Sequence, residues 1–208
     1  MSSPREWAAP SDAPVDGAAL LERAVGYARA SLQLVGTADP AARTPCPQWT
    51  LLDLLRHLDD SLAALTEAAD IGSVGLVPVR GAETGQPLVD RLKGRACALL
   101  AAWAHHPEDT GVAVADRELR SDWLAAAGSL EIAVHGWDVA QACGVDRPLP
   151  GTLALDLLDV VPHLVGEADR PGRFAERIDV PLQAGASTRL LAALGRPDRG
   201  SPRNQSGG

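Results

Sequence analysis

The stretch that decides the fold is Ser129-Leu-Glu-Ile-Ala-Val-His-Gly-Trp-Asp138, which carries a carboxylate and an imidazole four residues apart. Residues i and i+4 share one face of a helix, so Glu131 and His135 would lie one turn apart on the same side. The residues around them are largely apolar, which predicts a helix that is buried nearly all round. Because an unpaired buried glutamate is costly, we expect the pair to bind a divalent metal ion.

A metal site needs a third protein ligand, and His57 is a strong candidate. It lies within the helical run Leu51-Leu-Asp-Leu-Leu-Arg-His-Leu58. Two neutral imidazoles and one carboxylate are the ligand set of several open catalytic zinc sites. The sequence therefore predicts a metal site formed by His57, Glu131 and His135. Zinc is the preferred ion, and nickel or another divalent ion is the alternative.

Two residues near the predicted ligands have two interpretations each. Asp138 follows His135 by one turn, and it either holds that imidazole in place or is a solvated acid. Cys46 precedes a predicted helix, and it is either a reactive thiol or, as we favour, a small buried residue. The histidines that we do not expect to bind the metal are His105, His106 and His163.

The spacing of apolar residues predicts four long helices that form a bundle. A Gly-rich crossover over residues 70–85 joins the second helix to the third, an arrangement typical of four-helix bundles with one long connection. Thr50 and Asp53 resemble a capping box at the start of the second helix, and Ser121 is expected to cap the fourth. The predicted helices cover residues 16–35, 50–69, 87–105 and 121–143.

Shorter elements are predicted between and after these helices. Residues 111–119 are typical of a short strand or hairpin. After the bundle, helices near residues 152–166 and 187–194 flank a strand-like segment at residues 177–181. The predicted fold class is therefore mainly α, a four-helix bundle with a small α(+β) C-terminal extension.

The chain divides into four predicted segments. The first, rich in Pro, Ser and Ala, is expected to be flexible, and the last is expected to be a disordered tail. Between them lie the metal-binding bundle and the small C-terminal extension. The boundaries of the four segments are residues 1–15, 16–146, 147–198 and 199–208.

The composition excludes several classes of function. With a net charge of −8 and no basic cluster, the 208-residue chain lacks the surface of a nucleic-acid-binding protein. No stretch approaches the roughly 20 apolar residues of a membrane span, and the N-terminus lacks the apolar core of a signal peptide. Three cysteines without a CxxC motif are expected to be reduced thiols, so we predict a cytoplasmic protein. The expected partner is a small-molecule substrate, and the chain is expected to be a monomer or a homodimer.

Two longer stretches carry a family resemblance: Thr44-Pro-Cys-Pro-Gln-Trp-Thr-Leu-Leu-Asp-Leu-Leu-Arg-His57 and Glu131-Ile-Ala-Val-His-Gly-Trp-Asp-Val-Ala-Gln-Ala-Cys-Gly144. They resemble the DinB-like superfamily of metal-binding four-helix bundles, and more narrowly the mycothiol-dependent maleylpyruvate isomerase family of actinobacteria. The tail Arg189-Leu-Leu-Ala-Ala-Leu-Gly-Arg196 fits more weakly, and the likeness covers most of residues 16–195.

The resemblance implies the same three ligands. In this family one His of the second helix and two residues four apart on the last bundle helix hold the metal, a pattern that falls on His57, Glu131 and His135. Many DinB-like proteins have His at the first of the paired positions, whereas Glu131 matches the thiol-dependent members. The isomerases also carry a larger α+β C-terminal domain, and this chain has only about 60 residues after the bundle.

The resemblance further implies an enzyme that uses mycothiol, a low-molecular-weight thiol, as co-substrate. Its thiolate would add to an electrophilic carbon of a small metabolite; elimination after bond rotation gives isomerisation, and retention of the sulfur gives thiol transfer. Two alternatives stay open. One is a thiol-independent hydrolase, lyase or cyclase in which the metal activates water or a carbonyl. The other is a non-catalytic metal-binding module, which a fully occupied ligand shell would favour.

Overall fold

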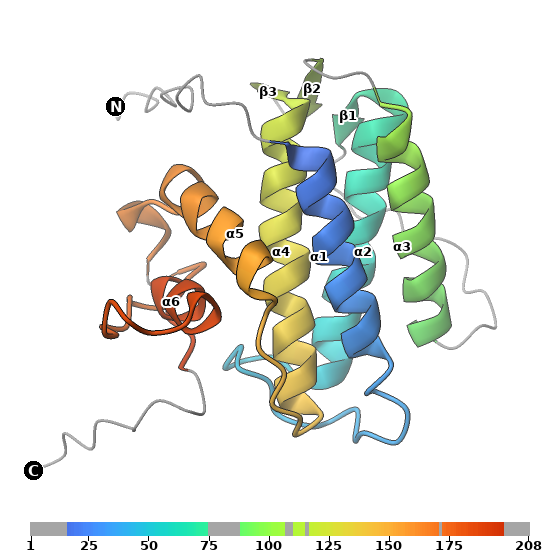
Figure 1. Cartoon of the computed structure of the whole chain (residues 1–208). Coiled ribbons are helices and arrows are strands. Elements are labelled where there is room, and N and C mark those ends of the chain that lie inside the picture. Colours follow the sequence, from blue (N-terminus) through green and yellow to red (C-terminus); the bar gives the residue numbers. More distant parts are fainter. Residues whose placement is uncertain (1–15, 75–87, 107–109, 115–116, 171, 198–208) are drawn as a thin grey trace, which may run out of the picture.

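Six α-helices and three short strands form the part of the chain that the computed structural model describes, residues 16–74, 88–106, 110–114, 117–170 and 172–197 (Figure 1). In chain order the elements are α1 (Gly17–Leu32), α2 (Leu51–Ile71), β1 (Ser73–Val74), α3 (Leu88–Ala104), β2 (Gly111–Val114), β3 (Arg117–Arg120), α4 (Ser121–Ala142), α5 (Gly151–Leu164) and α6 (Ala186–Ala193), with a short 3-10 helix at Glu167–Asp169. The fold is mainly helical, as the sequence predicts.

Helices α1 to α4 form a four-helix bundle with a small three-stranded sheet at one end (Figure 1). β1 follows α2 and β2 follows α3, and these strands pair in parallel, Ser73 with Ala113 and Val74 with Val114. Both helices therefore end at the sheet. β3 pairs antiparallel with β2 and leads directly into α4, which starts at the sheet and runs the opposite way.

α1 packs along α4 at close range, because glycines leave room for the neighbouring backbone. A Cβ atom at Gly136 would lie 3.0 Å from the Cα atom of Ala28, and one at Gly17 would lie 2.3 Å from the carbonyl oxygen of Asp122. These contacts join the first turns of the two helices and also their later turns, so α1 and α4 are parallel. Two helices run towards the sheet and two away from it, which requires one long connection between α2 and α3.

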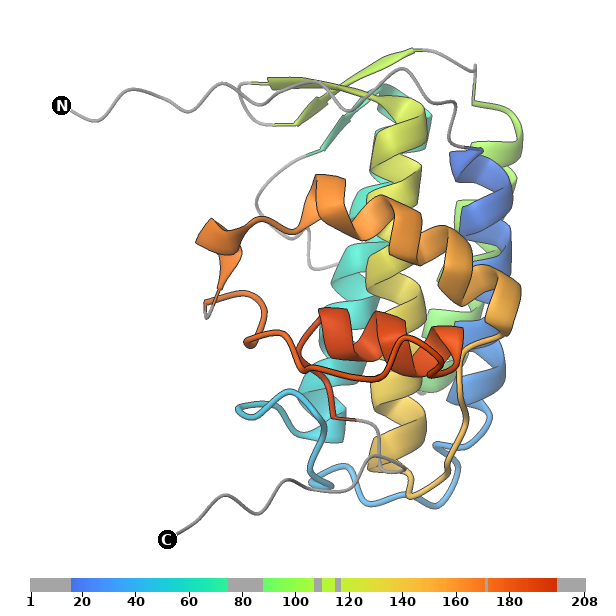
Figure 2. The same cartoon turned by 60° about the vertical axis from the view of Figure 1, so that its left-hand side comes forward.

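α4 is buried on nearly all sides, as its sequence predicts. Other bundle helices cover part of it, and α5 crosses it on another side (Figures 1 and 2). The exposed fraction is 5% for Leu130 and 1% for both Ile132 and Trp137. Most of the polar residues of this helix, among them His135 and Asp138, therefore lie inside the protein, where they need partners.

The C-terminal extension lies against the bundle through α5, and α6 packs on α5 (Figure 2). The connection from α4 is held by Arg147, whose guanidinium lies 4.5 Å from the ring centre of Tyr27 and donates to Ser31 Oγ at 2.8 Å. The Tyr27 hydroxyl donates in turn to the carbonyl oxygen of Arg147 at 2.6 Å. The backbone N–H of Leu149 donates to Ser187 Oγ at 3.0 Å, which joins the start of α5 to α6.

Local predictions are partly confirmed. The capping box is present, with the Asp53 N–H donating to Thr50 Oγ1 and the Thr50 N–H donating to Asp53 Oδ2. The hairpin predicted at residues 111–119 is present as β2 and β3, and β1 extends it to a sheet. The cap predicted at Ser121 is wrong: Arg120 is the N-cap residue, because β3 runs straight into the helix.

The strand-like segment predicted at residues 177–181 is also wrong. It is irregular, and the N–H of Ile178 donates to the carbonyl oxygen of Ala192 in α6 instead of to a neighbouring strand. The predictions for residues 1–15 and 199–208 lie outside the described residues, and the four segment boundaries stay predictions. None of the helices in the described part of the chain combines the length and the hydropathy that crossing a membrane requires.

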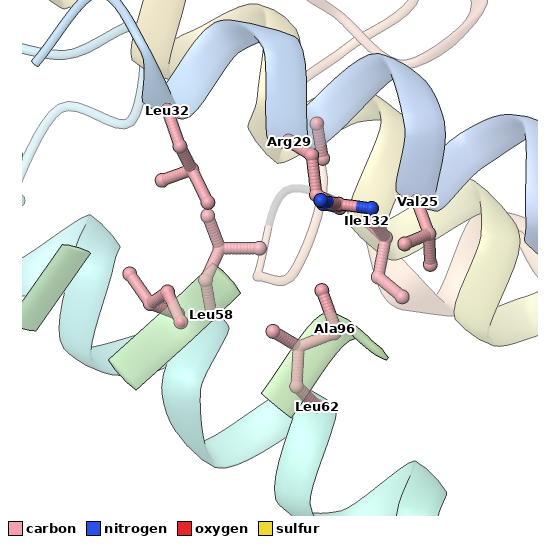
Figure 3. A pocket seen from close by; sticks show the side chains of 9 residues that line it. Val25, Arg29, Leu32, Leu58, Leu62, Ala96 and Ile132 are labelled. Atoms are coloured by element: carbon pink, nitrogen blue, oxygen red, sulfur yellow. The ribbon is translucent and has the colours of Figure 1, made fainter. Parts of the chain in front are cut away.

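One small apolar pocket lies inside the bundle, between α1, α2, α3 and α4 (Figure 3). Its volume of about 10 Å³ corresponds to a single water molecule, so it cannot hold a metabolite. The side chains that line it are those of Val25, Ala28, Arg29, Leu32, Leu58, Leu62, Leu92, Ala96 and Ile132.

Candidate metal centre

The side chains of His57, Glu131 and His135 converge between α2 and α4. Their ligand atoms all lie within 4.8 Å of one another. Oε1 of Glu131 is in contact with Nε2 of His57 and lies 3.2 Å from Nε2 of His135. Two imidazole nitrogens that face one carboxylate oxygen form a donor set suited to a divalent ion, with zinc as a good match.

Asp138 holds the imidazole of His135 from the side opposite Glu131. Its Oδ2 atom lies 2.9 Å from Nδ1 of His135, and its side chain is completely buried. A proton on Nδ1, donated to this carboxylate, leaves the lone pair of Nε2 facing Glu131. Ligating histidines are commonly oriented by a carboxylate in this way. Of the two interpretations of Asp138, the solvated acid is therefore wrong.

The guanidinium of Arg196, which follows α6, balances the negative charge of Asp138. Its Nε atom lies 3.0 Å from Oδ1 of Asp138 and its Nη2 atom 2.8 Å from Oδ2, the two-pronged geometry that makes arginine–carboxylate pairs strong. The turn before it requires glycine: Gly195 has a φ of +72°, and a Cβ there would lie 2.7 Å from backbone atoms of Ala175. The C-terminal extension thus supplies Arg196, which is hydrogen-bonded to Asp138 behind the candidate centre.

The loop before α2 forms another wall of the centre. The ring centre of Trp49 lies 4.6 Å from that of His57 and 5.7 Å from that of His135. Cys46 is half-buried, and its Sγ atom lies 3.5 Å from Oδ2 of Asp138 and 3.7 Å from Nη2 of Arg196.

A second group with metal-ligating chemistry consists of Cys46, His135 and Asp138. Asp138 already has the guanidinium of Arg196 as its cation, at 2.8 Å. A metal ion in this second group would have to share the carboxylate with that fixed positive charge. The group formed by His57, Glu131 and His135 is therefore the better candidate.

One side of this group is accessible to solvent. The exposed fraction of the side chain is 35% for His57 and 37% for Glu131, against 9% for His135 and 0% for Asp138. The buried residues support the centre from behind, and the exposed edges of the ligands leave access for a further ligand. An open position of this kind is the feature that separates catalytic zinc sites from closed structural ones.

Charged and polar neighbours at the centre stabilise the ionised forms of Glu131, His135 and Asp138. Burial by itself would raise the pKa of Glu131, but hydrogen bonds with His135 and His57 outweigh burial and hold its pKa well below the usual value. Burial would lower the pKa of His135, but Asp138, Cys46 and Glu131 together raise its pKa well above the usual value. The pKa of Asp138 is lowered against the effect of burial, chiefly by Arg196. Surroundings that favour a positive charge on His135 also suit a metal cation, which would replace the proton on that imidazole.

The sequence missed Arg196 and Trp49 as members of the centre. Arg196 is 58 positions from Asp138 and follows a glycine near the end of the chain, so no spacing connects the two. Trp49 had a weak signal, because it directly precedes the N-cap residue Thr50, where an apolar side chain commonly packs back on the helix. The three histidines expected to lie elsewhere do so. Nδ1 of His105 faces the carbonyl of Ala101, Nδ1 of His106 faces the carbonyl of Ala69, and His163 packs against Trp123.

Comparison with known families supplies an independent observation. The sequence model of the mycothiol maleylpyruvate isomerase N-terminal domain matches residues 21–140, more than half of the chain. The chain belongs to the mycothiol maleylpyruvate isomerase N-terminal domain family. The DinB-like bundle that the sequence predicts is the fold of the matched domain. Residues 21–140 of this family member include all three candidate ligands and Asp138, whereas Arg196 lies beyond them. A comparison with curated proteins found no match.

Proposed function

We propose that this protein is a metal-dependent enzyme that uses a low-molecular-weight thiol, mycothiol, to isomerise a small electrophilic metabolite or to transfer the thiol to it. The observation that carries the proposal is the convergence of His57, Glu131 and His135 at an accessible position, in a chain of the mycothiol maleylpyruvate isomerase family. These three side chains would hold the metal, with zinc preferred.

A divalent metal held there would lower the pKa of a thiol that joins it, and so would supply a thiolate nucleophile at neutral pH. Glu131 sets the charge: one carboxylate and two neutral imidazoles leave a net charge of +1 beside a divalent cation, which one thiolate balances. His135 presents the lone pair of Nε2 when its Nδ1–H donates a hydrogen bond to the carboxylate of Asp138. Arg196 keeps Asp138 ionised and in place. The exposed edges of His57 and Glu131 leave the approach for the thiol and for the substrate.

The alternative that needs no thiol uses the same residues. A hydrolase, lyase or cyclase would need the same accessible position for water or for a substrate carbonyl. The non-catalytic alternative is less well supported, because the best ligand group in the described residues has three members and two of them are about one-third exposed. The Glu131 carboxylate and the family match favour the thiol.

Metal binding is tested first, by competition between the purified protein and a chelator for Co²⁺ or Zn²⁺. Alanine at His57, Glu131 or His135 should each reduce the affinity steeply, because each removes one of three ligands. His105→Ala and His163→Ala are matched controls and should bind like the unaltered protein. Full metal retention by His57→Ala would show that the ligand set is wrong.

Thiol use is tested on the cobalt-loaded protein. Adding mycothiol should produce an intense sulfur-to-cobalt charge-transfer band, and mercaptoethanol should produce the same band at higher concentration because it lacks the sugar. The His135→Ala variant should give no band. If no thiol changes the spectrum at millimolar concentration, the thiol mechanism is excluded and the water-activating alternative takes its place.

A further inference from the structure

Beyond the candidate ligands and the acid that holds His135, the centre contains a cluster of three aromatic rings. Trp49, His57 and His135 lie in mutual contact, and the ring centres of the two histidines are 5.0 Å apart. Trp49 packs against both imidazoles at once. The rings of His57 and His135 are nearly perpendicular, with 85° between their planes, so a side chain that touches both opposes rotation of either.

The two imidazoles differ in what else holds them. His135 has Asp138 on Nδ1 and is only 9% exposed. His57 has one hydrogen-bond partner among the described residues, Glu131, which is itself a candidate metal ligand. The His57 ring is therefore restrained by Glu131, by the edge contact with His135 and by the contact with Trp49, whose ring centre lies 4.6 Å away.

Trp49 is itself held firmly by its backbone. Its N–H donates to the carbonyl oxygen of Cys46 at 3.0 Å, and its carbonyl oxygen accepts from the hydroxyl of Thr44 at 2.9 Å. The next residue, Thr50, is locked by the capping box with Asp53. Both backbone polar groups of Trp49 therefore have hydrogen-bond partners, and these bonds fix the backbone from which the indole projects, although Trp49 belongs to a loop.

We propose that Trp49 is a positioning residue of the metal centre: its indole packs on the imidazoles of His57 and His135 and holds their Nε2 atoms aimed at one point. The inference rests on the proposed function, because it assigns the two histidines as ligands. Its physical basis is preorganisation, since a ligand ring that is already oriented loses less conformational freedom when it binds an ion.

The test measures Co²⁺ affinity by chelator competition, together with the cobalt absorption spectrum and the melting temperature of the metal-free protein. Trp49→Leu removes the ring but keeps an apolar side chain. We expect its Co²⁺ affinity to fall roughly tenfold or more, as for other residues that orient metal ligands, and its cobalt spectrum to change. Trp49→Phe keeps an aromatic ring and should recover most of the affinity.

Trp123→Leu is the matched control. Trp123 also packs against a histidine, His163, with ring centres 5.1 Å apart, and its indole nitrogen has no hydrogen-bond partner among the described residues. This change should lower the melting temperature without altering Co²⁺ affinity. If Trp49→Leu behaves in the same way, Trp49 is a packing residue only and the inference is wrong.

Two further results separate the possible failures. If the unaltered protein does not bind Co²⁺, the proposed function is wrong and the inference fails with it, whatever the variants do. If Trp49→Leu does not fold, Thr44→Val decides, because it keeps the indole but removes the hydrogen bond to the Trp49 carbonyl that helps to hold the indole in position. It should lose affinity in the same direction but by less, and an unchanged affinity would contradict the inference.

Discussion

Replacing Arg196 by alanine should destabilise the protein far more than its place near the end of the chain suggests. Asp138 is completely buried, and Arg196, with a side chain only 14% exposed, is the cation that balances it. The Arg196→Ala variant leaves the carboxylate in the interior, where the imidazole of His135 at 2.9 Å and the thiol of Cys46 at 3.5 Å are its remaining partners.

The structure sets the expected size of this effect. Breaking a buried ion pair by removing one partner costs about 3–5 kcal/mol, and the bond retained from His135 places this case near the lower end, about 3 kcal/mol. Arg23 provides the contrast, because its pair with Asp156 also joins the bundle to the extension, at 2.7 Å. Those side chains are 40% and 50% exposed, so Arg23→Ala should cost no more than about 1 kcal/mol.

The assay is urea denaturation of the metal-free protein, followed by circular dichroism, for a double-mutant cycle with Asp138→Asn. Asparagine removes the buried charge, so Arg196→Ala should cost much less in that background than in the unaltered protein. Two results would refute the reasoning: a cost for Arg196→Ala no larger than that for Arg23→Ala, or the same cost in both backgrounds.

Three further predictions concern the fold around the centre. Burial raises the pKa of Tyr27, the only tyrosine, to about 12 against the opposing effect of Arg147, so the midpoint of its ultraviolet titration should lie above 10. The stability that depends on the protonated hydroxyl is complete below pH 10 and is lost as the pH rises towards 12. A titration midpoint near 10 would contradict the burial of this hydroxyl. Gly136→Ala should destabilise the protein by about 1–3 kcal/mol in thermal unfolding, because the new Cβ would lie too close to Ala28. Gly26→Ala, in the same bundle, places its Cβ in open space and should stabilise the protein by up to about 1 kcal/mol. Equal effects of the two substitutions would show that α1 and α4 are not closely packed at Gly136. Removal of the metal with a chelator should leave the helical circular dichroism largely unchanged, because the bundle has an extensive apolar core of its own, and wholesale unfolding would indicate a structural metal.

The helices were predictable because their determinants are local. The apolar stripe of α2, the capping box formed by Thr50 and Asp53, and the apolar surface of α4 all follow from residues within a few turns of one another. The same holds for Glu131 and His135, whose four-residue spacing puts them on one face of α4. Where local signals compete, prediction fails: Ser121 is a good N-cap residue, but the hairpin that runs into α4 moves the cap to Arg120.

The convergence of His57 on the pair could be anticipated only from bundle topology and the family resemblance. The two sides of that contact are 74 positions apart, and nothing in either helix states which neighbour it faces. The contact follows once α2 and α4 lie side by side in opposite directions. The sheet fixes these directions, because α2 ends at β1 and α4 begins after β3.

The sequence by itself determined a helical bundle, the candidate metal ligands on two of its helices, and a family. Only the tertiary structure decided that Asp138 is buried and that Arg196 and Trp49 belong to the same centre. Cys46 and Arg196 meet across 150 positions, through a loop and a turn that carry no periodic pattern. Periodicity reports which face of an element is buried, whereas the partner of a buried charge depends on how separate elements pack, and that is settled only when the whole chain is folded.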